Sequence, residues 1–144
     1  MGADFRICHE TTFEAIVDAG LNPLDICGPR TGMLIGYCMS DTWYAKTEDA
    51  SSYDSEWFEI FSEVSKNFRF GGPCTTYDSA CASSFSAFNE AVKLIEANVI
   101  DTAIVAGVGI CCAPQTAGGF MQLGMTSPDG RSKCMDKNAN GYVR

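Results

Sequence analysis

The sequence predicts an α/β fold in which helices alternate with the strands of a parallel sheet. Helical and strand-like segments follow one another along the chain, and residues 102–110 form a nearly continuous apolar run. Such a run is typical of a strand buried on both faces of a parallel sheet. Right-handed crossovers join elements in this order. A chain of 144 residues is long enough for one domain, or for part of a larger one.

The first predicted helix follows Thr11, a residue type that is common at the N-cap of a helix. Glu14 lies three residues further on, at the spacing of a capping box. Gly20 is expected to end the helix. Three apolar residues share one face of it and predict a helical period: Phe13, Ile16 and Val17.

The next elements are a strand, a loop and a second helix. The short apolar run 31–38 lies between glycines and predicts a buried strand, whereas the polar segment 40–52 predicts a loop. From residue 53 to residue 68, large apolar side chains recur at helical spacing, which favours a core or subunit contact over a ligand site. They are Trp57, Phe58, Phe61, Val64 and Phe68.

A second strand and a third helix follow the Gly-Gly-Pro break at 71–73. Residues 74–79 are rich in Thr and Tyr, which favours a strand. A helix over 82–97 is predicted from apolar residues about one turn apart, and the strand 102–110 comes next. The apolar residues are Phe85, Phe88, Val92 and Ile95. The segment 127–130, Ser-Pro-Asp-Gly, predicts a turn.

Composition and charge exclude several classes of function. The net charge is −8 with only ten Lys and Arg residues, which argues against a nucleic-acid or acidic-membrane partner. No apolar run approaches the roughly 18–20 residues that span a bilayer. The N-terminus lacks the pattern of a secretion signal. We therefore expect a cytoplasmic location.

Eight cysteines first suggest disulfides or a metal site, but no two of them have C-x-x-C spacing. The single histidine, His9, follows Cys8 without further spaced ligands, so we expect no metal. We interpret the cysteines as free thiols, most of them small buried side chains. A redox-sensing role for the adjacent Cys111 and Cys112 is a further, less favoured interpretation, because adjacent cysteines rarely form an unstrained disulfide.

Cys81 is the candidate nucleophile, because it lies where the strand 74–79 passes into the next helix. A helix N-terminus favours a thiolate through its dipole and free N–H groups. The small neighbours Ala80, Ala82, Ser83 and Ser84 would let a substrate carbonyl approach. The Cys81 N–H could then donate to an oxyanion. From these residues alone, simple packing of a small side chain remains the alternative.

Longer motifs around Cys81 resemble a known family. Gly72-Pro73-Cys74 is followed by Asp78-Ser79-Ala80-Cys81-Ala82-Ser83-Ser84, and Met125 to Arg144 reads MTSPDGRSKCMDKNANGYVR. In this order the motifs resemble the ketosynthase (beta-ketoacyl synthase) domain of animal-type fatty acid synthases and the related polyketide synthases. The resemblance covers residues 1–144, which we interpret as a partial N-terminal domain of that kind.

The resemblance implies a thiolase-like α/β/α layered sandwich, of which this chain is the N-terminal half. It implies that Cys81 accepts an acyl chain from the phosphopantetheine arm of an acyl carrier protein. Decarboxylative condensation with malonyl-acyl carrier protein then extends that chain in fatty acid biosynthesis. No cofactor or metal bound by the domain itself is implied. Family members form homodimers along the strand equivalent to 74–79.

Departures from the family pattern leave two alternatives. The two catalytic histidines of the family lie beyond residue 144, and His9 matches neither, so the chain alone is expected to be inactive in condensation. Charged or polar residues replace the family pattern at Glu63, Lys66, Asn67 and Arg69, where core packing is expected. The alternatives are a non-catalytic ketosynthase-like binding or dimerisation segment, and the ketosynthase of a polyketide synthase.

Overall fold

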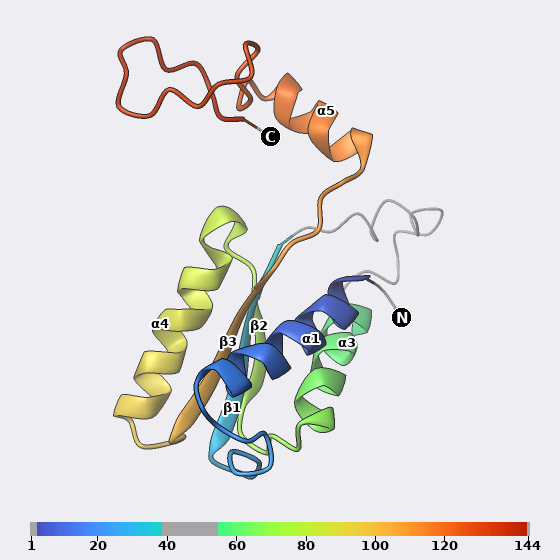
Figure 1. Cartoon of the computed structure of the whole chain (residues 1–144), viewed down its shortest axis with the longest axis vertical. Coiled ribbons are helices and arrows are strands. Elements are labelled where there is room, and N and C mark those ends of the chain that lie inside the picture. The colour runs from blue at the N-terminus through green and yellow to red at the C-terminus, as the bar shows by residue number, and fades with distance from the viewer. Residues whose placement is uncertain (1–2, 39–54, 144) are drawn as a thin grey trace. The chain divides into compact units, whose positions relative to one another are not determined.

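The computed structural model describes residues 3–38 and 55–143, with side chains described from residue 61 onward in the second range. The chain divides into two compact units, Met1–Ile110 and Cys111–Arg144. The first unit contains the alternating helices and strands, and the second contains one helix and a looped segment (Figure 1). No helix in the described ranges is long and apolar enough to cross a membrane.

The sheet of the first unit is parallel, as predicted. Strand β1 (Thr31–Tyr37) lies between β2 (Cys74–Tyr77) and β3 (Thr102–Val108), and both neighbours run parallel to it. Every residue of β1 is buried, which confirms the prediction for 31–38. Strand β3 is an edge strand of this sheet and is only half-buried, so the expectation of burial on both faces is wrong for it.

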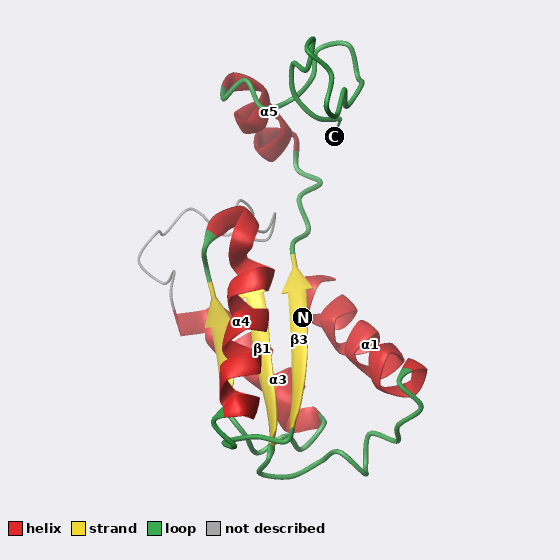
Figure 2. Ribbon diagram, turned by 90° about the vertical axis from the view of Figure 1, so that its left-hand side faces the viewer, coloured by secondary structure: helices red, strands yellow, loops and turns green. Residues whose placement is uncertain are grey.

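Helices cover both faces of the sheet, which gives three α/β/α layers (Figure 2). Helices α1 (Ala3–Asp18) and α3 (Ser55–Asn67) cover one face, and α4 (Ser83–Glu96) covers the other. Because side chains alternate along a strand, β1 contributes to both cores. Met33, Ile35 and Tyr37 enter the core under α1 and α3, while Leu34 packs against Ala87 and Ala91 of α4.

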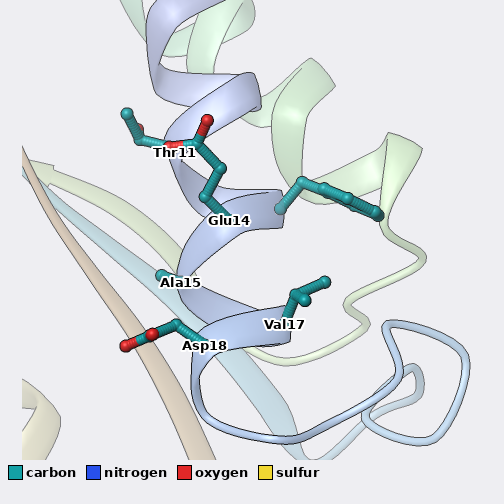
Figure 3. A pocket seen from close by; sticks show the side chains of 6 residues that line it. Thr11, Glu14, Ala15, Val17 and Asp18 are labelled. Carbon is teal, nitrogen blue, oxygen red and sulfur yellow. The ribbon is translucent and has the colours of Figure 1, made fainter.

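Helix α1 begins at Ala3, eight residues before the predicted N-cap Thr11. Thr11 is therefore no N-cap: its hydroxyl donates to the Ile7 carbonyl at 2.8 Å, one turn back, and Glu14 lies beside it on the same helix (Figure 3). The helix ends near Gly20 as predicted, and that glycine has a positive φ of 74°. Of the predicted apolar face only Ile16 is buried, because the core contacts also include Phe5 and Cys8 on the earlier turns. Phe13 and Val17 are about half exposed.

The substituted segment 63–69 does not place charge in the core. Phe61, Val64 and Phe68 are buried as predicted, while the side chains of Glu63, Lys66, Asn67 and Arg69 are exposed. Lys66 forms an ion pair with Glu63 at 2.6 Å on the outer face of α3. The expectation that these charges enter core positions is wrong. The helical phase of α3 points Glu63, Lys66 and Asn67 outward, and Arg69 lies in the turn after the helix. Trp57 and Phe58 belong to α3, but their side chains are outside the described part, as is the predicted loop 40–52.

Helix α4 was predicted from a stripe of large apolar residues, and it forms at that position. The residues that face the sheet are the small Ser83, Ala87 and Ala91. The large apolar side chains lie on the exposed side of the first unit: Phe85, Phe88, Val92 and Ile95. The spacing therefore identifies the helix but not the face that contacts the sheet.

The second unit contains a helix that the sequence analysis did not predict, α5 (Pro114–Gln122). The predicted turn at 127–130 is present: the Gly130 N–H donates to the Ser127 carbonyl at 3.2 Å. A parallel bridge pairs Thr126 with Tyr142, which brings the two ends of this loop together. The φ of Gly141 is 128°, and a Cβ there would lie 2.6 Å from the Ser127 nitrogen, so glycine is required.

Candidate active site

Cys81 lies in a short 3-10 helix, η2 (Ala80–Ala82), between β2 and α4, and its side chain is exposed. The connection leaves the carboxyl end of β2 and leads directly into the first turn of α4 (Figure 2). This is the strand-to-helix position that the sequence predicted. The positive end of the α4 dipole lies at this point. We name residues 78–84 the Cys81 turn.

Backbone strain is concentrated immediately before the cysteine. Ala80 has a φ of 51°, in the left-handed region, although it is not a glycine. A left-handed alanine costs about 1–2 kcal/mol relative to ordinary backbone. Strained turns of this kind between a strand and a helix project nucleophilic side chains outward, and persist only where the surroundings fix them.

Two polar side chains fix the Cys81 turn. The Asp78 carboxylate accepts a hydrogen bond from the Ala80 N–H at 3.0 Å. The Ser83 hydroxyl accepts one from the Ser79 N–H at 3.0 Å and donates to the Ala80 carbonyl at 2.6 Å. Ser83 is only 5% exposed, so these bonds are shielded from water. The sequence analysis treated Ser83 only as a small residue. For Asp78 a signal was available, because an Asp two residues before Ala80 has the spacing of an Asx turn.

Two glycines bring the first turn of α4 against the sheet. A Cβ at Gly36 in β1 would lie 2.3 Å from the Ser84 nitrogen, and one at Gly107 in β3 would lie 3.1 Å from the Ser84 Cβ. Gly36 and Gly107 are register partners in the β1–β3 ladder. The first turn of α4 therefore lies directly on two neighbouring strands, with its backbone on Gly36 and the Ser84 side chain on Gly107.

A second thiol lies next to the Cys81 turn. Cys38 directly follows β1 and is partly buried. Burial raises the pKa of Cys38, and so do the hydrogen-bonded Asp78 carboxylate and the neighbouring Cys81 thiol, while the Ala80 N–H lowers it. The sequence analysis did not single out Cys38, because its proximity depends on the pairing of β1 with β2.

The cysteines of the chain are less buried than predicted. Cys8 is buried and Cys74 is partly buried in the same core, and burial raises the pKa of both thiols. The expectation that most are buried is wrong, because loops and turns place the others at or near the surface: Cys27, Cys38, Cys81, Cys111, Cys112 and Cys134.

Neither His9 nor the hollow along α1 belongs to the Cys81 turn. The His9 ring stacks on Phe68 with ring centres 4.8 Å apart, so it is part of the packing between α1 and α3. A hollow of about 570 Å³ is lined by Thr11, Glu14 and neighbouring α1 residues (Figure 3). It lies on the outer side of that helix.

Fold and site together define a class of protein. An exposed cysteine stands on a strained strand-to-helix turn at the carboxyl edge of a parallel α/β/α sheet, which is the arrangement of a nucleophile turn. The family model of the beta-ketoacyl synthase N-terminal domain matches residues 1–144. The chain belongs to the beta-ketoacyl synthase family, and its fold is the thiolase-like one of ketosynthases.

Relatives of known name are synthases. The chain is 34% identical over 150 residues to the fatty acid synthase of Anser anser anser, covering all of this chain and 43% of that protein. It is 33% identical over 145 residues to the lovastatin nonaketide synthase of Monascus pilosus, covering 96% of this chain and 5% of that protein. The chain thus spans less than half the length of these relatives.

Solved structures agree with the sequence relatives. The ketosynthase from module 6 of the bacillaene synthase of Bacillus subtilis 168 matches with a TM-score of 0.83 and 28% identity, covering 99% of this chain and 25% of that one. An oxazolomycin ketosynthase domain from Streptomyces albus JA3453 matches with a TM-score of 0.82 and 26% identity, covering 97% and 26%.

Proposed function

We propose that Cys81 accepts an acyl chain as a thioester, as the first step of ketosynthase condensation in fatty acid synthesis. The cysteine sulfur attacks the thioester carbonyl of an acyl group presented on the phosphopantetheine arm of an acyl carrier protein. The phosphopantetheine thiol leaves and the acyl group remains on Cys81. In a longer protein with the complete catalytic set, condensation with a malonyl unit would follow, and such a protein would act as a homodimer.

The exposed position of Cys81 on the strained turn is the observation that supports this proposal best. Its sulfur is accessible, the neighbouring side chains are small, and α4 begins two residues later. The Cys81 N–H is our candidate oxyanion donor, because amides at a helix start point toward the site where negative charge develops. The family of the chain supports the same chemistry.

Acylation of the isolated chain tests the proposal without requiring condensation. The protein is incubated with an acyl-pantetheine thioester, and the adduct is mapped by mass spectrometry. We expect the acyl group on Cys81, and its loss in Cys81→Ser. Cys27→Ser is the matched control, because Cys27 is also exposed but lies outside the Cys81 turn. Equal labelling of the exposed thiols Cys27, Cys81, Cys112 and Cys134 would contradict the proposal.

A polyketide synthase role is the second candidate, and a specific observation favours it. The identity to the Monascus pilosus synthase, 33%, nearly equals that to the fatty acid synthase, 34%, and a polyketide synthase of Dictyostelium discoideum is 32% identical. Comparing straight-chain with hydroxylated or branched acyl-pantetheines distinguishes the two. The non-catalytic alternative was motivated by the substitutions at 63–69 and by the histidines that this chain lacks. The first reason is weakened, because those side chains lie at the surface, whereas the second still stands.

A further inference from the structure

The strand register brings the region after β1 close to the Cys81 turn. Strands β1 and β2 are parallel, and Gly36 pairs with Tyr77, so the residues beyond them leave the same edge of the sheet. Cys38 is two residues past Gly36, and side chains two apart on a strand point to the same face. A Cβ at Gly36 would point at Ser84. Cys38 is therefore directed toward the same side of the sheet as α4.

The direction of α4 brings Cys81 to the same place. This helix connects the parallel strands β2 and β3, so it runs back against their direction. Because the helix and the strand run in opposite directions, the chain before Ser84 extends the same way as the chain after Gly36. Cys81, three residues before Ser84, and Cys38, two residues after Gly36, therefore lie in the same direction from the contact. Both cysteines therefore lie near the carboxyl edge of the sheet, on the side of the Gly36–Ser84 contact toward which β1 runs.

Contacts of the Cys38 sulfur agree with this placement. It interacts with the Asp78 carboxylate and with the N–H of Ala80, the residue before Cys81, and it is close enough to Cys81 for their charges to interact. Cys81 is exposed and Cys38 is partly buried. Cys81 is therefore the more accessible of the two thiols to an oxidant in solution, and Cys38 is the less accessible one.

We propose that Cys38 and Cys81 form a reversible disulfide when a hydroperoxide oxidises Cys81. The Cys81 sulfur attacks one peroxide oxygen, the O–O bond breaks, and water leaves, which gives a sulfenic acid. The Cys38 sulfur then attacks the Cys81 sulfur, the S–O bond breaks, and the departing hydroxide takes the Cys38 proton as water. Two thiols lose two electrons, and hydrogen peroxide is reduced to two waters.

This modification would protect the Cys81 sulfur. A sulfenic acid without a partner thiol proceeds to sulfinic and sulfonic acids, which thiols do not reduce, whereas a disulfide is restored by thiol exchange. While the disulfide exists, Cys81 cannot accept an acyl group; this consequence rests on the proposed function, but the disulfide itself does not.

Peptide mapping after peroxide treatment tests the proposal on the complete chain. The reduced protein is treated with hydrogen peroxide, remaining thiols are alkylated, and the protein is digested with trypsin without reduction. We expect peptide 31–46 joined to peptide 70–93, with a mass about 2 Da below the sum of the two thiol forms. Because Cys74 lies in the second peptide, chymotryptic cleavage after Tyr77 separates it from Cys81.

Three variants make the result specific. Cys74→Ser should leave the crosslink unchanged, and Cys81→Ser should abolish it and leave Cys38 reduced. In Cys38→Ser the fraction of Cys81 recovered by dithiothreitol after peroxide should fall by about tenfold, as sulfinic acid accumulates. Recovery of Cys81 as sulfinic acid in the unsubstituted protein, with Cys38 still a thiol, would overturn the proposal. So would crosslinks of Cys81 mainly to Cys27, Cys112 or Cys134. Neither result would bear on acylation by a thioester.

Discussion

Ala80 is the residue whose conformation most directly determines where Cys81 points. Two hydrogen bonds maintain its positive φ: its N–H donates to the Asp78 carboxylate, and its carbonyl accepts from the Ser83 hydroxyl. Both partners are side chains of the same turn. The strain is thus compensated locally, within a few residues of Cys81.

Ala80→Gly is expected to raise the free energy of unfolding by roughly 0.5–1 kcal/mol, because relief of the left-handed strain exceeds the entropy cost of glycine. Ala82→Gly is the matched control. Ala82 has a φ of −96°, so glycine there brings only the entropy cost and should lower stability. Urea unfolding of both variants measures the difference. Equal losses in the two would show that Ala80 is not strained.

Asp129 is the central residue of a polar cluster in the second unit. Lys133 pairs with it at 2.5 Å, the Ser127 hydroxyl donates to it, and the Asn140 amide donates at 3.1 Å. The Lys133 ammonium, followed by the Ser127 and Asn140 donors, holds the pKa of Asp129 well below its usual range. Since the folded pKa is lowered, the ionised carboxylate stabilises the fold above the ordinary aspartate pKa.

This stabilisation should disappear as the pH falls below about 4, where the unfolded carboxylate begins to bind a proton that the folded one resists. The protection factors of the amides in residues 125–143, which compare each exchange rate with the intrinsic rate at the same pH, should therefore fall toward low pH. Asp129→Asn should remove most of the pH dependence of protection in residues 125–143. The control Asp25→Asn, at an exposed position, should leave it unchanged. An unchanged pH profile in Asp129→Asn would contradict the assigned role of the cluster.

At the scale of elements, the contact of α4 with the sheet depends on the missing side chain of Gly36. Gly36→Ala would force the α4 backbone from β1, since a Cβ there would lie 2.3 Å from the Ser84 nitrogen. We expect a loss of roughly 1–3 kcal/mol in the free energy of unfolding and slower acylation of Cys81.

Gly109→Ala provides the comparison, because nothing lies within 4 Å of a Cβ at that position. That variant should be as stable as the original chain or slightly more stable. Thermal unfolding and the rate of Cys81 alkylation would be measured on both. If Gly36→Ala behaved like Gly109→Ala, the close approach of α4 to β1 would not be what positions the cysteine.

Elements differ in how far their sequences predict them. The buried strand β1 is recognisable because its apolar run is continuous and bounded by glycines, and Cys81 because a strand ends before it and a helix follows. Helix α1 is misjudged at its start, because Thr11 and Glu14 match a capping box in the middle of a longer helix. Cys38 is overlooked because only the strand register, a long-range property, brings it to the site.

For the whole molecule, the family and the fold could be predicted, whereas the burial of large apolar residues could not. Phe85 is 77% exposed and Phe88 57% exposed, although their spacing is that of a core-facing stripe. A periodic pattern shows that a helix has an apolar face, but does not show which neighbour that face contacts. The chain covers only about a quarter of the matched ketosynthase structures. The contacts within this chain therefore correspond to only some of the contacts in those longer proteins.

The register between β1 and β3 also has a consequence for folding. Arg30 and Asp101, which pair at the start of these strands, are 71 residues apart in the chain. Contacts between such distant segments form slowly, because a long loop must close first. Ser84 packs on Gly36 and Gly107 together, so the Cys81 turn cannot reach its final shape before that closure. We therefore expect the Cys81 turn to be among the last features of the nascent chain to form, after the sheet has closed.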